Sequence, residues 1–158
     1  MTLQLFLELM NEDLMREWTH LKFYLYHSSA VTGLHAAEFR EWLTDAAKGE
    51  MQHVQQFLDR LFGLGYEQPA QVAHAFPLLV LPADILAYAA KLEKEVVVHY
   101  TERLKQLEQL DEPASAYLKV FYEDQLQDSY EDCERIQRML SGEVGQAHIR
   151  QFRYIPKD

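Results

Sequence analysis

Residues 49–53 read Gly-Glu-Met-Gln-His (GEMQH), which places Glu50 and His53 one helical turn apart. A carboxylate and an imidazole at positions i and i+3 share one face of a helix, where both can bind the same metal ion. The same pair is also an ordinary combination on a helix surface. The stretch therefore indicates a metal site only if other segments of the chain supply matching ligands.

The chain has 158 residues and a formal net charge of −10. This length can bury a sizeable core, and we expect one domain over residues 1–158. The acidic balance disfavours direct binding to nucleic acid. The single cysteine, Cys133, excludes a Cys-based zinc site and favours a reducing, cytoplasmic location. The amphipathic N-terminus and the lack of long apolar runs predict neither a signal peptide nor a membrane span.

Glycine and proline are scarce and clustered, and the stretches between the clusters lack the period-two pattern of strands. We predict helices at about residues 4–32, 36–63, 83–109 and 114–140, followed by a short tail or helix over 141–158. The first and third connections are short and the second is long. This pattern predicts an all-α four-helix bundle with a crossover between the second and third helices.

Three of the predicted helices carry an apolar stripe that a carboxylate interrupts near its middle. The interrupting residues are Glu17, Glu50 and Glu93, each at steps of three or four from its apolar neighbours. A buried carboxylate without a partner costs several kcal/mol, and three of them would repel one another across a core. A bound cation removes that cost, so the pattern favours a metal site. The alternative, in which each acid lies on a solvated face, stays open.

The fourth predicted helix has a less regular stripe. We expect its inward positions to be Tyr117, Val120, Asp124, Gln127 and Glu131. Asp124-x-x-Gln127 repeats the spacing of Glu50-x-x-His53, which predicts Asp124 and Gln127 as ligands from this helix. Glu123 and Gln125 are adjacent alternatives.

Taken together, Glu17, Tyr24, the Glu50-Met-Gln-His53 stretch and Glu93 resemble the di-iron site of bacterioferritin and ferritin, in the ferritin-like superfamily. The resemblance covers most of the chain and implies the ferritin-like type of bundle. Bacterioferritins place a second Glu-x-x-His on the fourth helix, where this chain has Asp124-x-x-Gln127. The second iron position therefore departs from the family pattern.

The resemblance implies a ferroxidase and iron-storage protein that oxidises Fe(II) to Fe(III), with two iron ions per subunit and dioxygen or peroxide as the oxidant. Manganese or zinc are possible substitutes for iron. The implied ligands are Glu17, Glu50, His53, Glu93, Asp124 and Gln127. Glu50 would bridge the two ions, and four ionised acids would balance their charge.

Two further residues acquire a role through the resemblance. Tyr24 lies seven residues after Glu17 and would hydrogen-bond a ligand or donate an electron, the alternative being a tyrosine of the core. Met51 matches the methionine that binds haem between two bacterioferritin subunits, the alternative being a packing residue. The other histidines share no stripe, and we expect each at a surface or an interface: His20, His27, His35, His74, His99 and His148.

Three hypotheses about function stay open. The first is an iron-storing ferroxidase that forms a homo-oligomer, at least a dimer, with a 24-subunit cage as one form of it. The second is a small di-iron oxidase or peroxide-scavenging protein that stores no mineral. The third is a metal-poor structural bundle. A DNA-protecting mini-ferritin is disfavoured, because such proteins build their iron site between subunits with histidines of the first helix.

Overall fold

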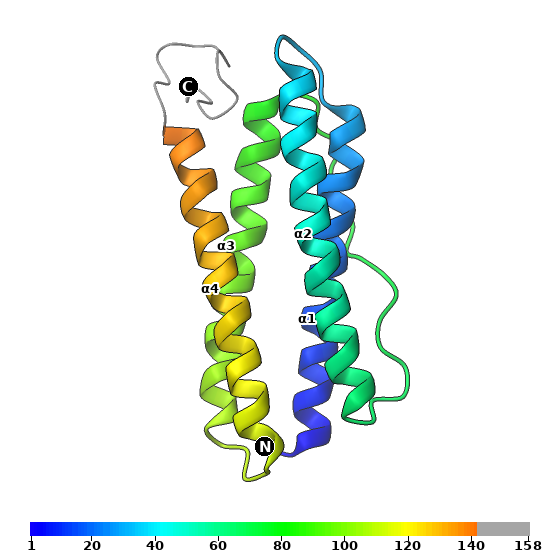
Figure 1. Ribbon diagram of the computed structural model, residues 1–158, viewed down its shortest axis with the longest axis vertical. Helices are drawn as coiled ribbons and strands as arrows, with labels where there is room; N and C mark the ends of the chain where they lie inside the picture. The colour runs from blue at the N-terminus through cyan, green and yellow to red at the C-terminus, as the bar shows by residue number, and fades with distance from the viewer. Residues whose placement is uncertain (142–158) are drawn as a thin grey trace.

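The computed structural model describes residues 1–141 as four long helices joined by loops (Figure 1). The helices are α1 (Leu3–Ala30), α2 (Ala36–Gly63), α3 (Pro82–Leu107) and α4 (Ala114–Ser141). No strand occurs within the described residues, so the all-α prediction is confirmed. The rest of the predicted tail lies outside them.

The helices form two antiparallel pairs, with α1 packed on α2 and α3 packed on α4. A short turn joins α1 to α2, and Gly33 adopts a positive φ of 105° there, which glycine allows without strain. The crossover over residues 64–81 runs the length of the bundle, so α2 and α3 are parallel (Figure 1). The predicted ferritin-like topology is thus confirmed.

The crossover is attached to α1 by side-chain hydrogen bonds. Asn11 and Trp18 of α1 bond the backbone of Ala70, both at 2.7 Å. Thr19 accepts from the backbone of His74 at 2.8 Å, and His27 accepts from the backbone of Leu79 at 3.1 Å. His27 is completely buried, so the expectation of a surface or interface residue is wrong there. These bonds hold residues 70–79 against α1 and cover one side of the bundle.

Two apolar clusters fill the bundle. One includes Leu14, Val54, Phe57 and Val96; the other includes Phe23. The second cluster continues through residues at the opposite end of the bundle: Phe39, Leu43, Ile85 and Leu86. Between the clusters lies a layer of buried polar side chains. None of the four helices is long and apolar enough to cross a membrane.

Candidate metal centre

Three carboxylates from three helices meet in the polar layer. Glu17 of α1, Glu50 of α2 and Glu93 of α3 are buried, with exposed fractions of 1%, 4% and 1%. Apolar residues one turn away on each helix belong to the two clusters, and their packing holds these positions inside. The three stripes predicted to carry inward acids are therefore found as expected.

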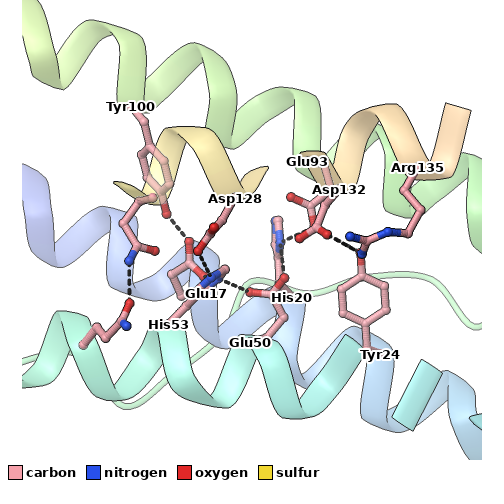
Figure 2. Close-up of polar contacts among 12 residues, drawn as sticks. Glu17, His20, Tyr24, Glu50, His53, Glu93, Tyr100, Asp128, Asp132 and Arg135 are labelled. Atoms are coloured by element: carbon pink, nitrogen blue, oxygen red, sulfur yellow. Dashed lines mark hydrogen bonds and ion pairs between the residues drawn. The ribbon is translucent and has the colours of Figure 1, made fainter. Parts of the chain in front are cut away.

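Glu50 faces a histidine with each of its two oxygens (Figure 2). Its Oε2 lies 3.0 Å from Nδ1 of His53, which is also 3.3 Å from Oε2 of Glu17. Its Oε1 lies 3.7 Å from Nδ1 of His20, which is also 3.3 Å from Oε1 of Glu93. Two groups of ligand atoms result, each compact enough for one metal ion, and Glu50 belongs to both.

His20 was not predicted as part of this site. It was expected at a surface or an interface, but it is buried with an exposed fraction of 2%. The sequence held the signal, because Glu17-Trp18-Thr19-His20 repeats the Glu-x-x-His spacing of Glu50 and His53. The predicted inward stripe of α1 contained Glu17 and Leu21 and did not include His20.

Glu17 and Glu93, the outer carboxylates on either side of Glu50, each accept a hydrogen bond from a buried tyrosine. Tyr24 of α1 donates to Oε1 of Glu93 at 3.1 Å, and Tyr100 of α3 donates to Oε1 of Glu17. Each tyrosine lies seven residues after the glutamate of its own helix and bonds to the glutamate of the other. The predicted contact of Tyr24 with a carboxylate of the cluster is therefore present, and Tyr100 is its counterpart.

The carboxylates and imidazoles of this layer shift one another's pKa. Burial alone would lower the pKa of His53, but the facing Glu17 and Glu50 carboxylates raise it to about 12. Glu93 and Glu50 likewise raise the pKa of His20 well above its ordinary value, against the effect of burial. Burial raises the pKa of Glu17 and Glu93, whereas hydrogen bonds from the two histidines overcome burial and lower the pKa of Glu50. Without a metal, the imidazoles therefore carry protons that partly compensate the carboxylates.

The family model for the ferritin-like domain matches residues 7–141 of the sequence. The chain belongs to the ferritin-like family. No curated protein sequence matches it.

Three solved structures share the fold of this ferritin-like protein. A ferritin-like, diiron-carboxylate protein from Bacillus anthracis str. Ames superposes with a TM-score of 0.79 and 22% identity, over 87% of this chain and 96% of that one. BfrA from M. tuberculosis gives 0.77 and 18%, over 85% and 82%. A dodecameric thioferritin, the bacterioferritin-related protein from Bacteroides fragilis, gives 0.69 and 17%, over 85% and 83%.

The fourth helix of this ferritin-like protein faces the core through a different stripe from the predicted one. Asp124 and Gln127 are exposed, and Gln127 donates a hydrogen bond to Glu131 at 3.3 Å. Tyr117 and Val120 of the same predicted stripe are exposed as well. The prediction that these residues face inward is therefore wrong, and the structure does not bring Asp124 or Gln127 to the cluster.

The buried residues of α4 define its true inward stripe: Leu118, Phe121, Tyr122, Gln125, Ser129, Ile136 and Met139. Gln125, one of the two predicted alternatives, is buried, and its amide nitrogen donates to Gln56 of α2 at 2.6 Å. The α4 stripe is weakly marked in the sequence, since apolar and aromatic residues also occupy the exposed face. Periodicity alone therefore did not fix the rotation of this helix.

Two other acids of α4 approach the cluster. Oδ2 of Asp128 lies 3.3 Å from Nε2 of His53. Asp132 is half-buried and pairs with Arg135 at 2.9 Å (Figure 2). Burial, together with the charges of Glu93 and Glu50, raises the pKa of Asp132 to about 7. These acids, rather than Asp124, stand where α4 meets the polar layer.

A pocket of about 470 Å³ opens between α2 and α4 and reaches Glu50 and His53. Asp128 and Asp132 line it together with other acids, Asp45 and Glu131, and with Arg135. An acidic pocket concentrates cations from solution. The polar layer is therefore accessible from the surface along a path that favours positive ions.

Met51 lies on the outer face of α2, with an exposed fraction of 57%. Its predicted role as a haem ligand stays a prediction, and any such site would be separate from the cluster.

The donor set fits metal ions on its chemistry. Three carboxylates and two imidazoles are the mixed oxygen and nitrogen ligands that iron and manganese accept. Nδ1 of His53 carries at most one hydrogen, and this hydrogen is donated to Glu50. Oε2 of Glu17 therefore has no hydrogen-bond donor although it is buried. A bound cation would satisfy this oxygen and replace the protons on the imidazoles.

Proposed function

We propose that this ferritin-like protein binds two iron ions in the polar layer and oxidises them from Fe(II) to Fe(III). The observation that carries this proposal is the pair of ligand groups that share Glu50. Glu17 and His53 would hold one ion and Glu93 and His20 the other, with one oxygen of Glu50 facing each group.

The donor set supports two ions because it holds three of the four parts of the di-iron pattern, distributed differently among the helices. That pattern has one carboxylate from each of two helices and a Glu-x-x-His from each of the other two. Here α1 and α2 each supply a Glu-x-x-His, and α3 supplies Glu93. We propose Asp132 of α4 as the remaining carboxylate, because it is half-buried and electrostatically coupled to Glu93 and Glu50.

Iron is the substrate of the proposed reaction. Two Fe(II) ions give up one electron each, and dioxygen takes both electrons with two protons to form hydrogen peroxide. With peroxide as the oxidant, two electrons and two protons give two water molecules instead. The chain's own part is to hold the two ions side by side, so that both electrons leave together, and to keep the ligands oriented.

The tyrosines would act on the ligands. Tyr24 and Tyr100 each fix one carboxylate through a hydrogen bond, which sets the direction of its other oxygen. Tyr24 would also be close enough to the second ion to donate an electron through Glu93.

Iron storage and self-association form the second part of the proposal. Storage needs a closed shell of subunits, and the related dodecamer from Bacteroides fragilis supports an assembly of this general kind. Exposed apolar residues of α1 and the crossover support contacts between copies: Leu25, Tyr26, Val72, Leu78 and Val80. We propose a homo-oligomer, and a cytoplasmic location that suits its single cysteine.

Anaerobic titration of metal-free protein with Fe(II), followed by admission of oxygen, tests the proposal. We expect two Fe(II) bound per chain and rapid ferric absorbance, both lost in Glu50→Ala. Asp132→Asn should weaken the second Fe(II) by about tenfold or more, as loss of a ligand or its partner does. Asp124→Asn is the matched control on the same helix and should leave both the number of bound Fe(II) ions and their oxidation unchanged. One Fe(II) per chain, or binding without oxidation, would refute the ferroxidase proposal.

A further inference from the structure

A second pocket, of about 300 Å³, opens on the other side of the bundle, between α1, α3 and the crossover. His20 lines it, so the pocket reaches the polar layer from the side opposite the α2–α4 pocket. The hydrogen bond from the His74 backbone to Thr19 fixes the crossover at its rim. This pocket plays no part in the proposed entry of cations.

The charges in this pocket have the opposite sign to those of the α2–α4 pocket. Arg16 and Lys91 supply these charges, and His74 and His99 also line the pocket. In the described part of the chain, Glu95 is the one carboxylate among its lining residues. Such a pocket attracts anions and repels metal cations.

The cationic side chains have hydrogen-bonding capacity to spare. Arg16 bonds Asp13 through Nη1 at 2.9 Å, and a guanidinium has five N–H donors, so others are available to a ligand. Lys91 lies 4.0 Å from Glu95, and both side chains are largely exposed. An exposed pair at this distance is weak, so an anion competes readily for the ammonium group.

The two pockets would thus divide the approach to the polar layer by charge. Cations would approach from the α2–α4 pocket and anions from the α1–α3 pocket.

We propose that the α1–α3 pocket, lined by Arg16, Lys91 and His20, binds a small inorganic oxyanion, for which inorganic phosphate is the probe. The site goes beyond the proposed function, since its own cationic residues are present whether or not metal is bound. Bound metal is not required for it.

Phosphate binding to metal-free and Zn²⁺-loaded protein, followed by ³¹P NMR and calorimetry, tests the proposal with three single-charge variants of α3. Lys91→Gln should weaken binding by about tenfold or more, the value of one charge-assisted hydrogen bond. Glu95→Gln removes the opposing carboxylate and should tighten binding. Lys94→Gln is the matched control, because Lys94 does not line this pocket. All three positions are exposed, and circular dichroism checks the fold.

Equal phosphate affinity in Lys91→Gln and Lys94→Gln, or no binding at millimolar phosphate, would overturn this inference. Two metal ions per chain with either result would leave the proposed function intact. Conversely, phosphate binding that depends on Lys91 and Glu95 in a protein that binds no metal would support the pocket and refute the metal centre.

Discussion

Tyr24 of α1 donates a hydrogen bond to Glu93 of α3 across the bundle, at 3.1 Å. A second hydrogen bond mirrors it, from Tyr100 of α3 to Glu17 of α1. The two pairs enclose the polar layer from its two ends, one next to each apolar cluster. The outer carboxylates are therefore held in place before any metal arrives.

Removal of either tyrosine hydroxyl should destabilise the metal-free protein. Tyr24→Phe and Tyr100→Phe each remove one hydrogen bond to a buried carboxylate oxygen, at a cost of about 1–3 kcal/mol in the free energy of unfolding. Tyr130→Phe, at an exposed position of α4, is the control and should have almost no effect. Urea denaturation measures all three. If Tyr24→Phe is as stable as Tyr130→Phe, the hydrogen bond does not hold Glu93.

His20 should be needed for one metal ion and not for the other. His20→Gln removes the imidazole from the group formed with Glu50 and Glu93 but leaves Glu17 and His53 intact. We expect the number of Co²⁺ ions bound per chain to fall from two to one, measured by equilibrium dialysis and visible absorption. His99→Gln, a half-buried histidine of α3, should still bind two. Two Co²⁺ ions in His20→Gln would contradict the assignment.

The sequence was sufficient for the fold and for half of the centre. Each Glu that interrupts the stripes of the first three helices stands out because its neighbours at three and four residues are apolar, and this contrast predicted burial correctly. His20 was not predicted because a neighbouring residue fits the same periodicity. Leu21 also continues the α1 stripe at a step of four, and both residues face inward because the stripe is wider than one row.

The fourth helix shows what periodicity cannot resolve. Tyr117, Val120 and Tyr130 are exposed on α4, whereas Tyr122 and Gln125 are buried. Polar and aromatic residues thus occur on both faces, and the sequence holds no contrast that fixes the rotation. The contacts that do fix it join α4 to residues far away in the chain, as in the hydrogen bond from Tyr122 to Asp13 at 2.7 Å.

The stability of the metal-free protein should fall as the pH rises. The carboxylates that face His20 and His53 raise the pKa of both, to about 12 for His53, although burial acts in the opposite direction. A raised histidine pKa adds stability that is complete below the unfolded value of about 6.5 and is lost as the pH rises through the folded value. Burial raises the pKa of Glu17 and Glu93, which acts in the same direction.

Denaturation at about pH 6.5, 8 and 9, with and without Zn²⁺, measures this dependence. Because bound metal displaces the imidazole protons, the stabilisation by Zn²⁺ should grow over the same range. Metal-free stability that stays level or rises across this window would show that the histidines are not held in their charged form.

A buried ion pair beside the centre should matter for stability but not for metal binding. Arg103 of α3 bonds both oxygens of Asp13, at 2.8 and 3.2 Å, and both residues are buried. Arg103→Met removes the buried cation but leaves Arg16 beside Asp13 at 2.9 Å, so it should cost about 1.5–3 kcal/mol, whereas Arg103→Met with Asp13→Leu should recover part of the loss. Lys105→Met, at an exposed pair with Glu102, is the control. Loss of metal stoichiometry in the double variant would contradict this separation.

Anomalous diffraction from crystals loaded with Co²⁺ distinguishes a paired metal centre from a single site, because it locates each ion. We expect two peaks per chain, one among Glu17, Glu50 and His53 and the other among His20, Glu50 and Glu93, with one oxygen of Glu50 facing each. A single peak, or a peak at Asp124 and Gln127, would contradict the paired centre.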